Sequence, residues 1–372
     1  MDVRYKIEDT SEIYSPALVV YPEIILENIE KMIAIAGDAA RLRPHCKTHK
    51  MCEVTKMELE LGITKHKAAT FAEAEMLAAA GVPDVFLAYN LVGPNIARAV
   101  SFKEKFPTAL FSVTADHARP IAQLGEAMSA AGKTIDVLLD VDTGMHRTGT
   151  ELGVKAKQLY QQIVETEGLN PGGLHVYDGH NHQESFDERR EAVRSFWKSV
   201  VRFRDELVRE DWAVPRIVAG GTGTFPVYAE IDNEPTLELS PGTTVLHDVG
   251  YRDAFPDLEF TPAALLLTRV ISLPGKDRVT CDLGHKAVAA DQPAGRRLEF
   301  PDLPDAKQVL QNEEHLVLET SRAGEFQPGD ELLAIPRHIC PTSALHKQVF
   351  VVTNGKLSGR WDVAARDRWI TV

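Results

Sequence analysis

The first candidate for chemistry is a lysine in the basic run Arg-Pro-His-Cys-Lys-Thr-His-Lys at residues 43–50. A short, mostly apolar approach precedes this run and a helical pattern follows it, which predicts Lys47 at the carboxyl end of a buried strand. Partial burial lowers the pKa of a lysine and frees its amine to attack a carbonyl group. Lys47 is therefore the first candidate for a Schiff-base lysine. The alternative is a solvated basic loop that binds a phosphate or only keeps the chain soluble.

A glycine-rich turn, Gly-Gly-Thr-Gly-Thr at residues 220–224, follows the apolar strand predicted at residues 217–219. The backbone N–H groups of such a turn can point at a phosphate, and the threonine hydroxyls add donors. The turn lacks the Gly-Lys-Ser/Thr of a Walker loop. It is thus a candidate phosphate site, with a plain tight turn as the alternative.

Two further strand ends carry residues that could serve a ligand. Residues 140–147, Asp-Val-Asp-Thr-Gly-Met-His-Arg, combine two carboxylates with one guanidinium. Arg147 could pair with Asp142 as a structural brace. Tyr177 ends the next apolar run, where a buried tyrosine commonly fills core.

A candidate metal site combines His338 and Cys340, with His180 and His182 far away in the sequence. Residues separated by one position lie on the same face of an extended strand, so His338 and Cys340 are predicted to reach one ion. Imidazole and thiolate together favour zinc, whereas manganese and magnesium prefer harder ligands. The alternative is a satisfied histidine beside a buried thiol.

The elements that position these residues alternate between apolar strands and helical patterns. After an extended opening at residues 16–21 and a helix over 22–36, eight strands are predicted. They end near Lys47, Phe71, Asn90, Asp116, Gly144, Gly179, Thr224 and Asp248. This order predicts an α/β fold, a (β/α)8 TIM-type barrel over residues 22–257, with its active site at the carboxyl ends of the strands. Residues 258–372 contain short strand-like segments and predict a smaller β domain, joined by residues 1–21.

Composition excludes several function classes. The 372 residues carry a net charge of -13, from 41 basic and 54 acidic residues, and the basic residues form no cluster. A nucleic-acid surface is therefore not expected. No apolar run approaches the roughly 20 residues of a membrane span, so no membrane partner is expected. Cysteines 46, 52, 281 and 340 form no CxxC pair, which favours reduced thiols in a cytoplasmic protein.

The chain resembles the D-threonine aldolase and D-serine dehydratase group of fold-type III pyridoxal-phosphate enzymes, which are related to alanine racemase. The basic run at residues 43–50 carries the first part of this resemblance. Further parts follow in the family's order at residues 69–75, 140–149, 177–180, 220–224 and 338–342. The resemblance implies that Lys47, and not Lys50, holds pyridoxal 5'-phosphate.

The resemblance also assigns roles to the other candidates. It implies that Arg147 and Tyr177 lie beside the cofactor and that its phosphate is held by Gly221, Thr222 and Thr224. It places a divalent metal, zinc, manganese or magnesium, on His338 and Cys340. Fold relatives imply a homodimer.

The activity implied by the resemblance is that of a lyase acting on a β-hydroxy-D-amino acid. We expect a retro-aldol cleavage of D-threonine-like substrates into glycine and an aldehyde, with His182 or His180 as the base at the hydroxyl group. The alternative is a D-serine or 3-hydroxy-D-aspartate dehydratase that releases ammonia, which a cysteine at position 340 favours. A less favoured alternative is a non-catalytic cofactor-binding protein, but such proteins are lone barrels and would not need the second domain.

Overall fold

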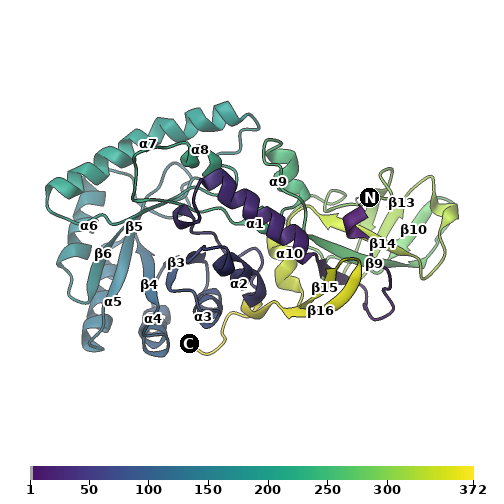
Figure 1. Ribbon diagram of the computed structural model, residues 1–372, viewed down its shortest axis with the longest axis horizontal. Coiled ribbons are helices and arrows are strands. Elements are labelled where there is room, and N and C mark those ends of the chain that lie inside the picture. Colours follow the sequence, from purple (N-terminus) through teal and green to yellow (C-terminus); the bar gives the residue numbers. More distant parts are fainter. Residues whose placement is uncertain (1–2) are drawn as a thin grey trace. The chain divides into compact units, whose positions relative to one another are not determined.

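A computed structural model describes residues 3–372, which divide into two compact units (Figure 1). The barrel unit comprises residues 32–47, 55–242 and 367–372. The sheet unit comprises the residues up to 31, residues 48–54 and residues 243–366. Residues 1 and 2 of the predicted joining segment lie outside the described part of the chain. The assignment of the cofactor to residues 22–257 and of the metal to residues 258–372 stays a prediction.

Seven parallel strands form the sheet of the barrel unit, and their order in the sheet follows their order in the chain. They are β2 (Lys65–Ala68), β3 (Asp84–Asn90), β4 (Leu110–Ala115), β5 (Ile135–Asp140), β6 (Leu169–Val176), β7 (Ile217–Ala219) and β8 (Leu237–Leu239). Phe86, Leu138 and Val218 form a fully buried cluster of this unit. The α/β barrel fold with a separate β domain is confirmed.

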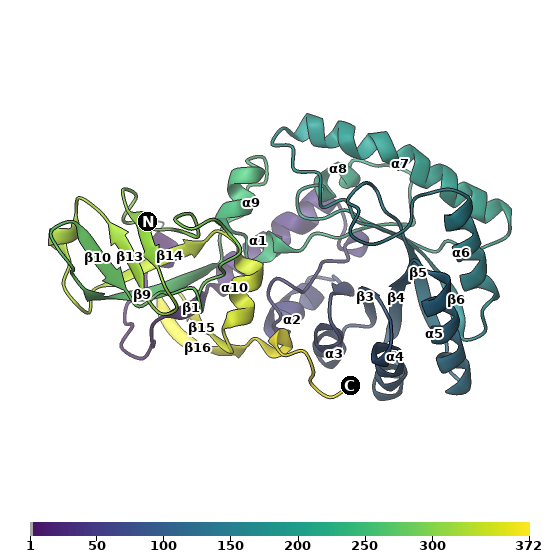
Figure 2. The same ribbon diagram turned by 180° about the vertical axis from the view of Figure 1, so that it is seen from behind.

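Helices connect these strands. They are α2 (Cys52–Glu60), α3 (Phe71–Ala79), α4 (Pro94–Lys105), α5 (Ala118–Ala130), α6 (Val154–Glu165), α7 (Phe186–Arg209) and α8 (Phe225–Ala229). Helix α3 packs on β2 and β3, and α6 packs on β5 and β6. Figure 2 shows α5 and α6 beside the strands of this sheet. A Pro or Gly commonly marks the start of such helices, as at Pro94 of α4.

The segment predicted as the first barrel strand makes isolated bridges instead. Leu42 pairs with Leu239 of β8, and His45 pairs with Lys67 of β2, both in parallel. Pro44 has no N–H to donate, so a regular ladder cannot run through it. Its carbonyl still accepts from the Lys67 N–H at 2.8 Å, and the segment thereby links β8 to β2. The predicted eighth strand near Asp248 is also wrong, because β8 ends at Leu239 and residues 243–245 form a 3-10 turn.

The sheet unit holds nine strands. They are β1 (Ala17–Val20), β9 (Ala264–Ser272), β10 (Arg278–Cys281), β11 (Leu298–Glu299), β12 (Lys307–Gln311), β13 (Leu316–Glu319), β14 (Glu331–Pro336), β15 (Gln348–Thr353) and β16 (Lys356–Asp362). Strand β1 lies between β9, which is antiparallel to it, and β15, which is parallel. Helix α1 (Pro22–Ala36), predicted from the sequence, follows β1 and ends in the barrel unit.

One buried carboxylate joins two short helices of the sheet unit, α9 (Val249–Ala254) and α10 (Ile339–Leu345). Asp248 is the N-cap of α9 and accepts from the Tyr251 N–H at 2.8 Å. Its other oxygen accepts from the Ile339 N–H at 2.9 Å, at the start of α10. Burial raises the pKa of Asp248 to about 6, although these backbone hydrogen bonds oppose the rise. Across residues 3–372, every helix is too short or too polar to cross a membrane.

Candidate functional site

Tyr177 is the centre of the candidate site, and it follows directly after strand β6. Three cationic side chains approach its ring. Lys47 Nζ lies 5.8 Å from the ring centroid, Lys67 Nζ lies 5.6 Å from it, and the Arg147 guanidinium carbon lies 4.9 Å from it. The structure thus brings together Lys47, Arg147 and Tyr177, as the sequence predicts. Lys47 lies in a turn over residues 46–49, not at the end of a strand.

Arg147 is free of the brace that the sequence offered as an alternative. The Asp142 carboxylate instead accepts from the Gly144 N–H at 2.9 Å and lies 2.8 Å from the His146 ring nitrogen. It therefore fixes the loop after β5. Gly149 closes this loop in a left-handed conformation, and an added Cβ would lie 2.7 Å from the Asp142 backbone nitrogen. The Arg147 side chain therefore does not pair with Asp142 and lies over the Tyr177 ring.

Lys67 is a member of the site that the sequence analysis missed. It is the third residue of β2 and is only 3% exposed. Burial lowers its pKa to about 7, with help from the positive charges of Lys47, Arg147 and Arg43, while Asp140 opposes the shift. The alternation in Lys-His-Lys-Ala could have identified Lys67 as a site residue, because every second residue of a barrel strand faces inward.

Asp140 and His175 form a buried pair near these cations. His175 Nδ1 lies 2.8 Å from an oxygen of Asp140. Burial disfavours the charge on Asp140, but its hydrogen bond and interaction with His175, together with Arg147, hold the pKa of Asp140 below its usual value. Burial lowers the pKa of His175, even though Asp140 opposes this. The carboxylate is therefore engaged by a ring nitrogen.

The glycine-rich turn follows β7 and lies against Tyr177. A Cβ added to Gly221 would lie 3.1 Å from Tyr177 Cε2, so the backbone comes close to the ring at this point. Thr222 Oγ1 accepts from the Gly242 N–H at 3.1 Å. Thr224 Oγ1 accepts from the Gly221 N–H and donates to Asp178 at 2.8 Å. Thr224 therefore shapes the turn through its side chain.

Two buried residues hold this turn in place. Asp178 accepts hydrogen bonds from Thr224, from Tyr228 at 3.1 Å and from Asn181 at 3.2 Å. Burial raises the pKa of Asp178, and these hydrogen bonds oppose the rise. Arg189 of α7 donates to the Gly223 carbonyl at 2.9 Å. Neither residue is marked by a local sequence pattern as a support of the turn.

The two candidate histidine bases differ in exposure. His182 is exposed, whereas His180 is half-buried. A Cβ added to Gly144 would lie 3.6 Å from His180 Nε2, which places this ring beside the loop that carries Arg147. The buried Nδ1 of His180 has no hydrogen-bond partner among the described residues. Burial and position therefore favour His180 over His182.

In the sheet unit, His338 and Cys340 lie at the start of helix α10, so the strand geometry predicted for them is wrong. His338 is the extended N-cap residue and Cys340 lies in the first turn. Their side chains nevertheless interact, because Cys340 raises the pKa of His338. The Cys340 sulfur also lies 3.2 Å from Thr48 Oγ1 and 3.5 Å from Thr243 Oγ1. The two predicted ligands are thus brought together by a helix end.

His338 also makes a short hydrogen bond through Nδ1 to Asp291. Burial lowers the pKa of His338, but the hydrogen bonds and charges of Cys340 and Asp291 outweigh burial and raise it to about 9. A carboxylate on one ring nitrogen is the usual support of a metal-binding histidine, because it directs the other nitrogen to the ion. The arrangement therefore fits a metal ligand.

A second group of possible metal ligands lies in the barrel unit. One ligand atom from each of His45, Cys46 and Glu73 lies within 4.8 Å of the others, and all three residues are buried. Glu73 accepts from the Ala69 N–H at 2.6 Å and lies 3.9 Å from Cys46 Sγ. The carboxylate is thus already used to join the turn before Lys47 to the start of α3.

Comparison with known proteins gives consistent matches over most of the chain. Residues 22–243 match the family described as alanine racemase, N-terminal domain, and residues 263–352 match a serine dehydratase domain. D-threonine aldolase of an Arthrobacter species is 31% identical, over 95% of this chain and 92% of that protein. 3-Hydroxy-D-aspartate aldolase of Paracoccus denitrificans is 28% identical, over 97% and 94%. The crystal structure of D-threonine aldolase from Filomicrobium marinum superposes with a TM-score of 0.88 at 27% identity, over 95% and 96%.

Proposed function

Because this chain belongs to the alanine racemase-like family and is a pyridoxal phosphate-dependent lyase, we propose that it cleaves β-hydroxy-D-amino acids by a retro-aldol reaction. The proposed products from a D-threonine-like substrate are glycine and an aldehyde. The observation that carries the proposal is the set of cations around Tyr177, next to a glycine-rich turn. An aromatic aldehyde with a phosphate suits this arrangement, because it needs an amine, a flat neighbour and backbone donors.

Each candidate site residue of the barrel unit has a proposed role toward the cofactor. Lys47 would hold it covalently, and Tyr177 would pack on its ring. Arg147 would stabilise a negative oxygen on that ring through its fixed charge. Gly221, Thr222 and Thr224 would form the phosphate site. When bound, pyridoxal phosphate takes up the negative charge that develops at the substrate's Cα.

His338 and Cys340 are the proposed ligands of a divalent metal. The hydrogen bond from His338 Nδ1 to Asp291 leaves Nε2 for an ion, and imidazole with thiolate suits zinc better than manganese or magnesium. A metal ion supplies a Lewis acid for the β-hydroxyl group of the substrate. His180, with His182 as the alternative, would take the hydroxyl proton.

A dehydratase is the second candidate, because Cys340 and the serine dehydratase match at residues 263–352 favour it. Dehydration differs in the bond that breaks. It needs a base at the Cα hydrogen, for which Lys47 would serve, and it releases ammonia with a keto acid. Retro-aldol cleavage leaves the Cα hydrogen in place and needs a base at the hydroxyl, which His180 offers.

Product analysis separates the two reactions. The purified protein is loaded with pyridoxal phosphate and incubated with D-threonine and with D-serine, with and without a chelator. We expect glycine and acetaldehyde from D-threonine, no ammonia, and loss of activity with the chelator. Release of stoichiometric ammonia without glycine would contradict the aldolase reaction and support the dehydratase reaction.

The metal ligands have their own test. His338→Ala and Cys340→Ala should each lower the metal content and remove most of the activity, while the visible absorption of the cofactor remains. Unchanged metal content in both variants would exclude this pair as the metal site. The homodimer and the cytoplasmic location stay expectations that gel filtration and cell fractionation would check.

A further inference from the structure

Lys67 is a buried lysine whose amine lies over the Tyr177 ring. The residue is 3% exposed, and Nζ forms no ion pair with a carboxylate of residues 3–372. The carboxylate that acts on it, Asp140, is already hydrogen-bonded to His175. Burial disfavours the charged form of this amine, so the loss of its proton or the approach of an anion is favoured here.

The position of Lys67 connects it to Lys47. The two amines lie at nearly the same distance from the Tyr177 ring, 5.6 Å and 5.8 Å. The backbone also joins the two segments, because the Cys46 N–H donates to the Lys67 carbonyl at 3.0 Å. Lys67 is thus a second amine in the proposed cofactor site, on a strand next to the turn of Lys47.

We propose that Lys67 is an acid–base residue of this site, which exchanges protons with the Lys47 amine and with the amino group of the bound amino acid. The inference rests on the proposed function, because it takes Lys47 as the cofactor lysine. It goes beyond that function, which assigns Lys67 no role. A simple fixed charge at this position is the competing role.

The proton balance of this role is simple. An amino acid arrives with a protonated amino group, which must lose one proton before it can replace Lys47 on the cofactor. Neutral Lys67 accepts that proton on Nζ. The released Lys47 amine then takes the same proton from Lys67, so Lys67 returns to its neutral form and no proton is gained or lost.

The surroundings of Lys67 suit an amine that changes its charge. The charged groups with the largest effect on it are the cations Lys47, Arg147 and Arg43 and the carboxylate Asp140. Together with burial, the cations bring the pKa of Lys67 to about 7, where both charge states are populated. General acid–base groups work best when their pKa lies near the working pH.

The test measures amine exchange without the lyase reaction. D-alanine has no β-hydroxyl group, so it can replace Lys47 but can be neither cleaved at the Cα–Cβ bond nor dehydrated. The exchange is followed by the change in visible absorption of the loaded protein in a stopped-flow instrument, across a range of pH. We expect the rate to fall as Lys67 becomes protonated below about pH 7.

Three variants separate the possible roles. Lys67→Met should slow the exchange about 10²-fold at pH 8 and remove the change near pH 7. Lys67→Arg should be equally slow, because guanidinium keeps its proton. Lys65→Met is the matched control on the same strand. Lys65 is paired with Glu238 at 3.0 Å, and its loss should leave the exchange rate unchanged.

Several results would overturn the inference. A normal rate in Lys67→Met would remove any role in exchange, and a normal rate in Lys67→Arg would show that a fixed charge suffices. Lys67→Ala adds a check, since ethylamine in solution should restore part of the rate. Absence of this rescue also contradicts the acid–base role.

Borohydride reduction and mass spectrometry then locate the cofactor. Cofactor on Lys47 in Lys67→Met, together with a normal exchange rate, would refute only the role of Lys67. Loss of the cofactor from Lys67→Met would make Lys67 a binding residue and overturn the acid–base role. Cofactor on a lysine other than Lys47 in the unmodified protein would instead refute the proposed cofactor site.

Discussion

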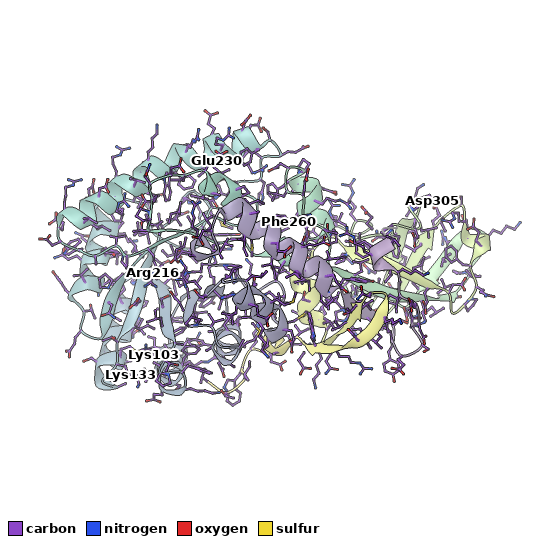
Figure 3. All side chains as sticks on the ribbon, in the orientation of Figure 1. Lys103, Lys133, Arg216, Glu230, Phe260 and Asp305 are labelled. Atoms are coloured by element: carbon purple, nitrogen blue, oxygen red, sulfur yellow. The ribbon has the colours of Figure 1, made fainter. Side chains whose placement is uncertain are left out.

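The two ends of the barrel strands differ in whether their cationic side chains form ion pairs. At the amino-terminal end, Arg43 is fully buried and pairs with Asp84 and Glu238. Arg216, labelled in Figure 3, pairs there with Asp136 at 2.8 Å. At the carboxyl-terminal end, Lys47, Lys67 and Arg147 approach the Tyr177 ring, and none of the three forms an ion pair with a carboxylate of residues 3–372.

This difference separates stability from chemistry. Paired charges at the amino-terminal end satisfy one another and hold neighbouring strands together. Unpaired cations at the carboxyl-terminal end are unfavourable by themselves, but they suit a ligand that brings anionic groups. Variants at the carboxyl-terminal end should therefore lose cofactor absorption or activity, and variants at the amino-terminal end should lose stability.

The largest expected effect on function is at the carboxyl-terminal end. Lys47→Ala should abolish the visible absorption of the bound cofactor and all measurable activity, because no other residue is proposed to form this bond. The melting temperature of the cofactor-free protein should change little. Lys50→Ala is the control and should keep the absorption. Loss of the absorption in Lys50→Ala but not in Lys47→Ala would show that Lys50 holds the cofactor.

The largest expected effect on stability is at the amino-terminal end. Arg43→Met leaves the Asp84 and Glu238 carboxylates without their main partner, and we expect a loss of about 3–5 kcal/mol in the free energy of unfolding. Urea unfolding followed by circular dichroism measures this loss. Protein that still folds should retain cofactor absorption. A variant as stable as the unmodified protein would contradict the importance of this network.

Lys67 should give the carboxyl-terminal end a distinct pH dependence. Its pKa is lowered from 10.5 to about 7 in the folded protein, so between these values the unfolded chain binds more protons. Stability should therefore rise with pH across this range, by up to about 1.4 kcal/mol per pH unit from this group. Below about pH 7 the full penalty remains. Urea unfolding of the cofactor-free protein should show this rise, and Lys67→Met should lack it.

The smallest expected effect comes from the partly exposed pair of the amino-terminal end. The Arg216 and Asp136 side chains are 14% and 29% exposed, so water screens their attraction. Arg216→Met should lower the free energy of unfolding by about 1 kcal/mol or less. A loss as large as that of Arg43→Met would mean that burial does not govern the strength of these pairs.

The sequence predicted the parts of the site that lie next to strong local signals. Lys47 and Arg147 stand in distinctive runs, and the glycine-rich turn follows an apolar strand. The alternation of apolar runs and helical patterns also placed Arg147 and the glycine-rich turn after strands β5 and β7, whereas the strand predicted before Lys47 is absent. Patterns of this kind are local, so they survive in a single sequence.

The missed features depend on contacts between distant segments. Lys67 stands in Lys-His-Lys-Ala of a strand that was predicted, but the sequence does not show which of the two lysines faces the site. The first barrel segment contains Pro44, and its pairing with β2 and β8 was not visible in the sequence. The segment after His338 was predicted as a strand, although Pro341 in the first turn is compatible with a helix.

The shared cap at Asp248 makes two remote amides report on the same event. The Tyr251 and Ile339 N–H groups point at the two oxygens of one buried carboxylate, although they belong to helices far apart in the chain. Any local opening that withdraws this carboxylate exposes both amides to solvent at once. Their deuterium uptake should therefore follow a common time course, which would make them a paired reporter of how this unit opens.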